Sequence, residues 1–209
     1  MTARSYDGAA ALASLAGRLG GPRPRGLPAL FALTDPARTP DPVRLARALP
    51  AGAGLILRTF GEADIEAKAF ELAETCRDRG VALLIAADPA LARACGADGV
   101  HWPERDLRRA FRPWPGAIVT ASAHGPSAIR RAGRIADAVF VSAVFASNSP
   151  SAGRPIGPFR LAAYATRSSA PVYALGGVNT RTVRRLERLG ISGVGAIAAI
   201  RGTREDADA

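Results

Sequence analysis

Lysine is almost absent from this sequence of 209 residues. It carries 28 basic residues against 18 acidic ones, and Lys68 is the single lysine among them. Nearly all the positive charge therefore comes from arginine, whose guanidinium group stays protonated at neutral pH and does not act as an amine nucleophile. Catalysis through a Schiff base, which needs a reactive lysine amine, is therefore nearly excluded.

Cysteine and histidine are also scarce. The two cysteines, Cys76 and Cys95, are too few for a disulfide framework and lack the CxxC spacing of a redox or zinc site. Both fall on apolar helix faces, so we expect buried free thiols. The two histidines, His101 and His124, are too few for a histidine-rich metal site.

Long apolar runs are missing as well. No run approaches the roughly 20 residues that a membrane-spanning helix needs, and the first residues include Asp7 without a strong apolar block. We therefore expect a soluble, cytoplasmic protein with no membrane partner. Hydrophobic residues make up 48% of the chain, which is enough to build the core of one domain.

The net charge of +10 raises the question of nucleic-acid binding. Its densest basic segments are Arg105–Arg112 and Arg181–Arg188, where arginines alternate with leucine, valine and alanine at helical spacing. Solvated faces of arginine-rich helices explain this pattern better than phosphate contacts do. We expect no specific nucleic-acid partner.

Residues 1–26 differ from the rest of the chain. An apolar pattern of helical period runs from Tyr6 to Leu19, and Gly20-Gly21, Pro22 and Pro24 then stop the helix and form a stiff linker. We predict an N-terminal helix and linker over residues 1–26, followed by one main domain over residues 27–209.

In the main domain, short apolar runs alternate with amphipathic segments, a pattern typical of parallel strands buried on both faces. The predicted strands are Ala29–Leu33, Gly54–Leu57, Ala82–Ala86, Gly99–Trp102, Ala117–Ala121, Ala138–Ser142, Val172–Leu175 and Gly193–Ala196. The predicted helices are Pro42–Ala48, Glu62–Arg79, Pro89–Ala94, Leu107–Phe111, Pro126–Ile135, Pro158–Thr166 and Thr180–Leu189.

Eight strand–helix units in this length predict a single (β/α)8 TIM barrel, an α/β fold whose chemistry occupies the loops after the strands. A doubly wound sheet is the alternative, but no GxGxxG motif follows the first strand. Few residues follow Ile200, so the N-terminal helix is expected to cover the place of a long eighth helix. Alternatively, we expect the N-terminal helix to form a contact in a homodimer.

The segment VYALGGV, Val172 to Val178, is the most informative motif. A buried strand runs into Gly176-Gly177, and Asn179 or Thr180 can cap the next helix. Glycines remove side chains where the backbone turns, so backbone N–H groups can face an anion. In such barrels the loops after the seventh and eighth strands form a recurring phosphate site. We therefore predict a phosphate site here, with Gly190–Ile200 as its second half.

Several motifs in order resemble those of thiamine phosphate synthase and its relative TenI. They are LFALTDP (Leu30–Pro36), LILR (Leu55–Arg58), GADGVHWPERD (Gly96–Asp106), SAH (Ser122–His124), VSAVFASNSPSAGRPIG (Val141–Gly157), ALGGV (Ala174–Val178) and GVGAIAAI (Gly193–Ile200). The resemblance implies a barrel that joins an aminopyrimidine methyl diphosphate to a thiazole phosphate and releases pyrophosphate with Mg²⁺.

The resemblance also implies roles for individual residues. The backbone of Gly176-Gly177 and Ile197–Ala198 would hold the thiazole phosphate, and Gly157 would border the thiazole. Arg58 and Ser122 would face the diphosphate, and Asp106 would bind Mg²⁺. Further substrate contacts are expected from the motif that contains Ser147 and Ser149 and from Arg154, whose guanidinium can bind phosphate bidentately.

Other positions depart from the family's pattern. Ala86-Ala87 replaces an Asn-Asp pair that includes a metal ligand, Phe60 and Pro150 replace lysines, and Glu104 replaces a glutamine. Asp88 is better explained as a helix cap than as a substitute metal ligand. Expelling pyrophosphate requires stabilisation of about three negative charges by cations or metal ions. These replacements weaken the diphosphate half of the site.

These observations leave three hypotheses about function. The leading one is a transferase of the thiamine phosphate synthase type. The second is a phosphate-ligand binding protein that has lost catalysis, motivated by Ala86-Ala87 and Phe60. The third is a TenI-like thiazole isomerase in which His124 carries the proton, because Ala143 stands where TenI proteins have their catalytic histidine. His124 can equally bridge two loops, and His101 is expected to be a packed strand residue.

Overall fold

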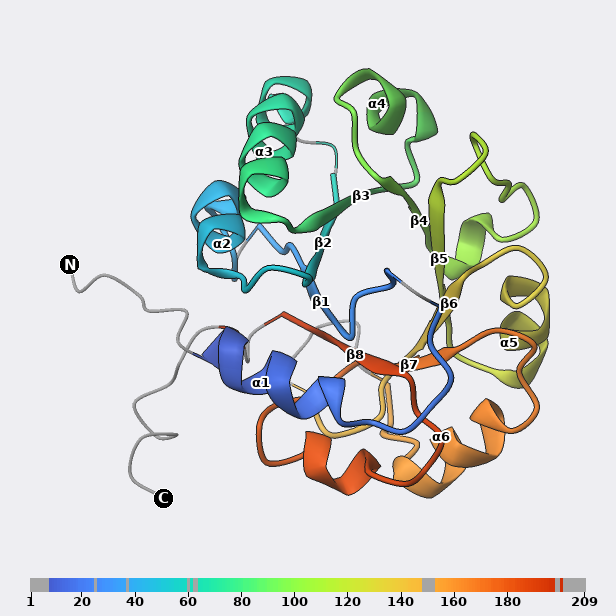
Figure 1. The fold of residues 1–209 in the computed structure, drawn as a ribbon. Helices are drawn as coiled ribbons and strands as arrows, with labels where there is room; N and C mark the ends of the chain where they lie inside the picture. The colour runs from blue at the N-terminus through green and yellow to red at the C-terminus, as the bar shows by residue number, and fades with distance from the viewer. Residues whose placement is uncertain are drawn as a thin grey trace.

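The computed structural model describes residues 8–24, 26–36, 38–59, 61, 64–147, 153–197 and 200. Eight parallel strands form a closed barrel in chain order, with β1 pairing with both β2 and β8 (Figure 1). The strands are β1 (Leu30–Leu33), β2 (Gly54–Leu57), β3 (Ala82–Ala86), β4 (Gly99–Trp102), β5 (Ile118–Ala123), β6 (Ala138–Val141), β7 (Val172–Ala174) and β8 (Gly193–Ala196). The predicted TIM barrel is confirmed.

Helices surround the barrel on its outer side (Figure 1). The α-helices are α1 (Gly8–Gly17), α2 (Pro42–Ala48), α3 (Ile65–Arg79), α4 (Pro89–Ala94), α5 (Pro126–Ala132) and α6 (Pro158–Ala165). Two short 3-10 helices, η1 (Glu104–Asp106) and η2 (Val183–Leu186), follow β4 and β7. Asp41 and Asp88 cap α2 and α4 by accepting hydrogen bonds from backbone N–H groups, which confirms the capping role expected for Asp88.

Two predicted helices are wrong in type. The segment 107–111 is not an α-helix, because Trp102 Nε1 donates to the carbonyl of Phe111 (3.1 Å) and holds this segment against the end of β4. The segment 180–189 is reduced to η2. There the Asn179 side chain accepts hydrogen bonds from two early N–H groups, and Arg188 adopts a left-handed conformation (φ 61°) that ends any helix.

Aromatic rings fill the centre of the barrel. Phe31 lies edge-on to Phe140 with ring centroids 5.5 Å apart, and Tyr173 packs on Phe140 at 5.2 Å. The hydroxyl of Tyr173 donates to the carbonyl of Pro28 (2.8 Å), so its one polar atom is satisfied. The interior is therefore a packed core, and any ligand must bind at an end of the barrel.

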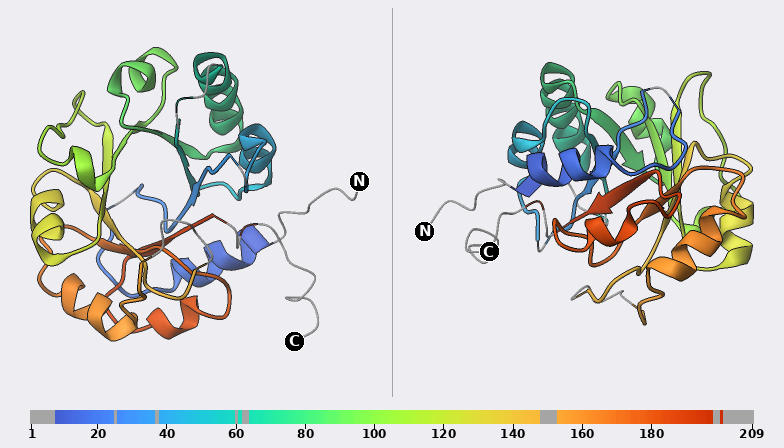
Figure 2. Two further views of the ribbon diagram at one scale, coloured as in Figure 1. Left: turned by 180° about the vertical axis from the view of Figure 1, so that it is seen from behind. Right: turned by 60° about the horizontal axis from the view of Figure 1, so that its bottom comes forward.

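The N-terminal helix closes the wall of helices. In α1 the side chains of Leu12, Leu15 and Ala16 are buried, and the helix contacts β1, β8 and η2. Both views in Figure 2 show α1 alongside the last strand. This arrangement agrees with the expectation that the N-terminal helix covers the place of an eighth barrel helix.

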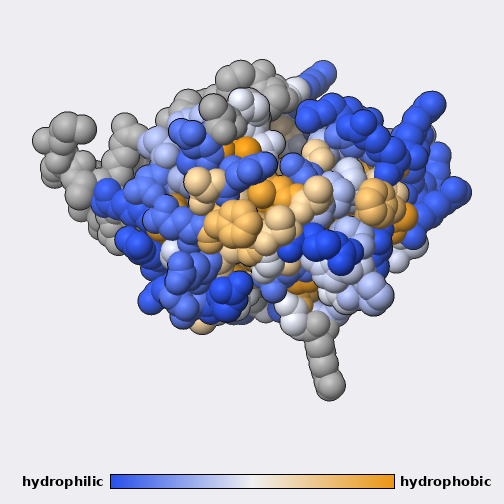
Figure 3. All heavy atoms as spheres, turned by 90° about the horizontal axis from the view of Figure 1, so that it is seen from above, coloured by the Kyte–Doolittle hydropathy of each residue, from blue (hydrophilic) through white to orange (hydrophobic). Residues whose placement is uncertain are grey.

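The face drawn in Figure 3 is covered mainly by hydrophilic side chains. Figure 3, which looks onto the side of the molecule where α3 and α4 lie, shows them surrounding a small central group of hydrophobic side chains. Of the helices within the described residues, none has both the length and the apolar character needed to cross a membrane. Cys76 and Cys95 are free and buried, as the sequence predicts.

Candidate active site

The carboxyl ends of all eight strands meet at one end of the barrel, because every strand pair is parallel. Three of the predicted site residues, Arg58, Ser122 and His124, lie at the ends of β2 and β5. The glycine pair 176–177 follows β7, and Ile197 follows β8. The fold therefore brings the predicted residues to one end of the barrel, where such folds place their chemistry.

Arg58 is fixed to the loop after β1. Its backbone N–H donates to Thr34 Oγ1 (2.8 Å), its Nε donates to the Thr34 carbonyl (2.5 Å), and its Nη2 lies 3.4 Å from Asp35 Oδ2. Arg38 pairs with the same Asp35 oxygen at 2.8 Å. Two guanidinium groups thus share one carboxylate, so this corner of the site keeps a net positive charge.

Burial and charge shift the pKa values in this corner. Burial lowers the pKa of the Arg58 guanidinium. The negative charge of Asp35 raises this pKa, and the positive charge of Arg38 lowers it further. For Asp35, burial raises the pKa, but hydrogen bonds from Arg38 and the charges of Arg38 and Arg58 outweigh burial, and the pKa is lowered. At neutral pH Asp35 is ionised and Arg58 is protonated, so this corner carries two guanidinium charges against one carboxylate.

Ser122 is held by a buried histidine. His101 Nε2 lies 2.9 Å from Ser122 Oγ, and His101 Nδ1 lies 2.9 Å from Thr120 Oγ1. Burial, with a smaller contribution from the charge of Arg58, lowers the pKa of His101 to about 3. A neutral imidazole between two hydroxyl groups fixes the Ser122 side chain at the mouth. This confirms His101 as a packed strand residue and adds a positioning role.

His124 lies on the rim and is bound to Glu104. The side chain is 57% exposed, and its Nδ1 lies 2.6 Å from Glu104 Oε2. The same carboxylate oxygen accepts a hydrogen bond from the His124 backbone N–H at 2.6 Å. Glu104 thus joins the loop after β4 to the end of β5, which is the loop-bridging role considered for this histidine.

Asp106, the expected Mg²⁺ ligand, is paired with arginines. Its side chain is 8% exposed, its Oδ1 lies 2.7 Å from Arg109 Nη2, and its Oδ2 lies 3.7 Å from Arg105 Nε. Ala87 occupies a left-handed conformation (φ 60°) at the end of β3 and offers no donor atom to a metal. Across the described ranges, no three His, Cys, Asp or Glu side chains are grouped as metal ligands. As arranged here, these residues do not fit an Mg²⁺ site.

The glycine pair after β7 packs on the loop after β6. Gly176 and Gly177 have φ of 86° and 65°, and a Cβ on Gly177 would lie 2.2 Å from the carbonyl oxygen of Ala146. Thr182 Oγ1 donates to the Gly177 carbonyl (3.0 Å), which fixes this peptide group. Asn179 Oδ1 accepts hydrogen bonds from the N–H groups of Arg181 and Thr182 in the turn before η2, whereas η2 itself has no side-chain cap.

The N–H groups of this turn remain available to a ligand. Toward the other residues that the structure describes, the N–H groups of Gly176 and Gly177 donate no hydrogen bond. The carbonyl of Gly176 instead accepts from the Phe145 N–H (3.0 Å), so the loop after β6 is held against the turn. Consecutive N–H groups in left-handed conformations form a concave donor surface of the kind that binds anions.

The remaining predicted residues lie on the loops after β6 and β8. Gly157, with φ of 77°, precedes α6, and its N–H donates to the Val144 carbonyl (3.0 Å). Ile197 is half-buried directly after β8, Ser147 is half-buried on the loop after β6, and Arg154 is exposed. Ser149 and Ala198 lie outside the described residues, as do Phe60 and Pro150.

Three residues near the site were not predicted from the sequence: Thr34, Asp35 and Lys68. Thr34 and Asp35, which anchor Arg58, lie in the LFALTDP motif, so their position after the first strand was an available signal. Lys68, in the first turns of α3, lines a hollow of about 120 Å³ together with Arg58 and Thr34. No periodicity in the sequence could show that the single lysine lies beside Arg58.

The fold and these residues define a TIM-barrel protein with a cationic corner and a glycine turn at the carboxyl ends of its strands. The family described as "Thiamine monophosphate synthase" matches residues 30–200. The chain is 32% identical over 191 residues to the thiamine-phosphate synthase of Alcanivorax borkumensis, covering 86% of this chain and 88% of that one. It is 33% identical over 185 residues to the thiamine-phosphate synthase of Thiobacillus denitrificans, covering 82% and 86%.

A solved structure agrees at the level of the fold. The thiamine phosphate pyrophosphorylase of Pyrococcus furiosus superposes with a TM-score of 0.69 at 23% identity, covering 86% of this chain and 89% of that one. The chain belongs to the thiamine monophosphate synthase family, a family of thiamine biosynthesis.

Proposed function

We propose that this protein is a transferase that joins an aminopyrimidine methyl diphosphate to a thiazole phosphate. The observation that carries the proposal is the turn at Gly176 and Gly177, whose N–H groups make no hydrogen bond to other described residues. Together with the backbone at Ile197, this turn would hold the phosphate of the thiazole. A backbone cradle needs no lysine, which suits a chain that has only Lys68.

The second substrate would bind at the opposite side of the mouth. Arg58 provides a protonated, anchored guanidinium, and Ser122 provides a hydroxyl held by the neutral His101. When the carbon–oxygen bond of the aminopyrimidine methyl diphosphate breaks, the electron pair leaves with pyrophosphate. A cation already fixed beside the leaving group stabilises the developing charge without reorganisation.

A second candidate is a binding protein without transferase activity. The specific observation in its favour is the pairing of Asp106 with Arg109 at 2.7 Å, together with Ala87 at the end of β3. The isomerase hypothesis gains no such observation: Glu104 binds the Nδ1 of His124 and leaves Nε2 able to carry a proton, but this side chain is 57% exposed on the rim and joins two loops. We therefore keep the transferase and the binding protein as the two functions to separate.

The separating experiment measures pyrophosphate release from purified protein with both substrates, with either substrate alone, and with and without added Mg²⁺. Release that requires both substrates supports the transferase. Binding of thiazole phosphate in a calorimeter without any release supports the binding protein. If neither binding nor release occurs, the proposed phosphate site is wrong.

Arg58→Gln provides the matched test of the diphosphate half. Removing a charge-assisted contact to a phosphate oxygen is expected to weaken binding of inorganic pyrophosphate about tenfold or more. Arg79→Gln, which removes an exposed arginine at the last turn of α3, serves as the control for net charge. Equal effects of the two substitutions would remove Arg58 from the site.

A further inference from the structure

A second concentration of positive charge lies outside the barrel, between the N-terminal helix and η2. Six residues line a hollow of about 320 Å³, which we call the α1–η2 hollow: Leu15, Arg18, Gly20, Arg184, Glu187 and Arg188. Its two sides come from opposite ends of the chain. The segments beneath it lead into the amino end of β8, whereas the glycine turn and Ile197 follow the carboxyl ends of β7 and β8. The hollow is therefore separate from the candidate active site.

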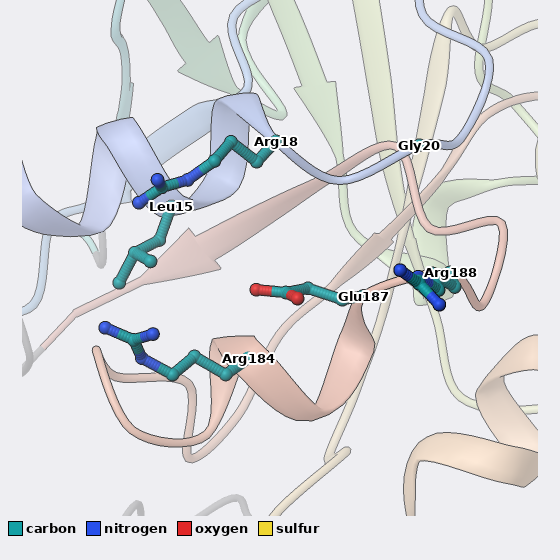
Figure 4. Close-up of a pocket in the computed structure, with 6 residues that line it drawn as sticks. All are labelled: Leu15, Arg18, Gly20, Arg184, Glu187 and Arg188. Atoms are coloured by element: carbon teal, nitrogen blue, oxygen red, sulfur yellow. The ribbon is translucent and has the colours of Figure 1, made fainter.

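Among the residues that the structure describes, no carboxylate pairs with the three arginines of the hollow. Other arginines of the protein are paired, for example Arg112 with Asp137 at 2.8 Å and Arg109 with Asp106 at 2.7 Å. By contrast, the guanidinium groups of Arg18, Arg184 and Arg188 form no ion pair or hydrogen bond with any residue in the described part of the chain. In Figure 4 Arg18 and Arg184 lie on one side of Glu187 and Arg188 lies on the other. Positive charges that line one hollow without partners attract an anion.

The arrangement of side chains is open toward a ligand. Figure 4 shows the side chains of Arg18, which directly follows α1, and Arg184, from η2, extending to the same side of the hollow, with Leu15 between them. The carboxylate of Glu187 is directed toward that space and makes no ion pair with a described residue. The lining thus combines three cations, one hydrogen-bond acceptor and one apolar surface.

The backbone beneath the hollow is fixed. The N–H of Gly21 donates to the carbonyl of Ile191 (3.0 Å), and a Cβ at Gly21 would lie 2.4 Å from the Ile191 carbonyl carbon. Arg23 Nη1 donates to the Ser192 carbonyl at 2.8 Å. These contacts pin the chain after α1 to the segment after η2, so both sides of the hollow are held before a ligand arrives. Preformed sites avoid part of the ordering cost of binding.

The lining selects a class of ligand. Three arginines and one glutamate give the hollow a net charge of +2, and a phosphate monoester carries about −2 at neutral pH. A volume of about 320 Å³ lies at the lower end of the range of small-molecule sites and exceeds what a bare phosphate needs. The Glu187 carboxylate can accept hydrogen bonds from hydroxyl groups of the organic part.

We propose that the α1–η2 hollow is a binding site for a phosphate monoester of a small hydroxylated molecule, such as a sugar phosphate. Arg18 and Arg184, which extend to the same side of the hollow, bind the phosphate, and Glu187 binds a hydroxyl group. This site does not depend on the function proposed for the barrel mouth.

The test follows backbone amide signals of the isotopically labelled protein by NMR, because these signals report on each site separately. The probes are glucose 6-phosphate, inorganic phosphate and glucose. We expect glucose 6-phosphate to shift the amides of Leu15, Gly20, Glu187 and Arg188, and inorganic phosphate to do so more weakly. Glucose leaves them unchanged. No shift of these amides at about 10 mM glucose 6-phosphate would overturn the proposal.

Two sets of variants test the assigned roles. Arg18→Gln combined with Arg184→Gln is expected to weaken glucose 6-phosphate binding about tenfold or more. Arg131→Gln combined with Arg134→Gln removes the same charge from exposed positions near α5 and is expected to change affinity less than about twofold. Equal losses in the two double variants would show nonspecific attraction and refute a built site.

Glu187→Gln should change the affinity for inorganic phosphate in the opposite direction. Removing its negative charge is expected to tighten binding of inorganic phosphate about twofold or more, while the preference for glucose 6-phosphate over inorganic phosphate falls. Because Glu187 is exposed, we expect the fold to tolerate this substitution. Weaker binding of inorganic phosphate to this variant would contradict the role given to the carboxylate.

Discussion

Substitution of Gly177 by alanine tests how the glycine turn is built. Its φ of 65° is a left-handed conformation, which costs an alanine about 1–2 kcal/mol. The added Cβ would also lie 2.2 Å from the Ala146 carbonyl oxygen and 2.8 Å from the Phe145 carbonyl carbon. Because these are backbone atoms, the loop after β6 must move, at a further cost of about 1–3 kcal/mol. We therefore expect a loss of about 2–5 kcal/mol in the free energy of unfolding.

Gly157 provides the matched control for this prediction. Its φ of 77° and ψ of 163° form a conformation that is essentially restricted to glycine, but a Cβ there would have no heavy atom within 4 Å, so Gly157→Ala should cost only the conformational share of about 1–3 kcal/mol. Gly153→Ala, with open space and no positive φ, should change stability little. The assay is urea unfolding followed by circular dichroism. Equal losses at Gly177 and Gly157 would refute the close packing of the turn on the loop after β6.

Three further predictions concern the ionisable residues of the mouth. His101, with a pKa of about 3, should show no titration by NMR between pH 8 and 4.5. Because the pKa of His101 is lower in the folded than in the unfolded chain, protonation favours the unfolded chain as pH falls below about 6.5. The free energy of unfolding should therefore fall by roughly 2 kcal/mol at pH 5. His101→Gln should remove this share of the acid sensitivity, and an unchanged pH profile would contradict the burial argument. Arg58→Lys should weaken inorganic pyrophosphate binding about tenfold, because an ammonium cannot reproduce the guanidinium contacts to both Thr34 and a ligand, and unchanged affinity in calorimetry would count against it. His124→Gln should leave any pyrophosphate release within about threefold of the original rate, because this side chain is 57% exposed on the rim and joins two loops, whereas a loss of about 100-fold would restore this histidine as a proton carrier.

The barrel could be predicted from the sequence because its strands are short apolar runs separated by strong helix starts and stops. Asp41-Pro42 and Asp88-Pro89 begin helices exactly where the side chains cap them, and β2 to β4 match their predicted bounds. The predicted helix at 107–111 failed because a tertiary contact, Trp102 to the Phe111 carbonyl, competes with local helix propensity.

The site was predictable only in part. Motif order placed Arg58, Ser122 and the glycine pair at one end of the barrel. It could not show that Asp106 is paired with Arg109, since an Asp–Arg spacing of three residues also occurs where both side chains face solvent. Nor could it bring Arg18 and Arg184 together, because they are far apart in the chain and meet only through the docking of α1 beside η2.

The central claim is that the mouth of this barrel holds the phosphate of a thiazole phosphate through the backbone of the glycine turn. Calorimetric titration with thiazole phosphate and with the corresponding thiazole alcohol tests it most directly. The account predicts that the phosphate ester binds at least about tenfold more tightly than the alcohol, because only the ester has several charged oxygens that accept charge-assisted hydrogen bonds from the N–H groups of Gly176 and Gly177 together. Equal affinity for the two compounds, or no binding of either, would contradict it.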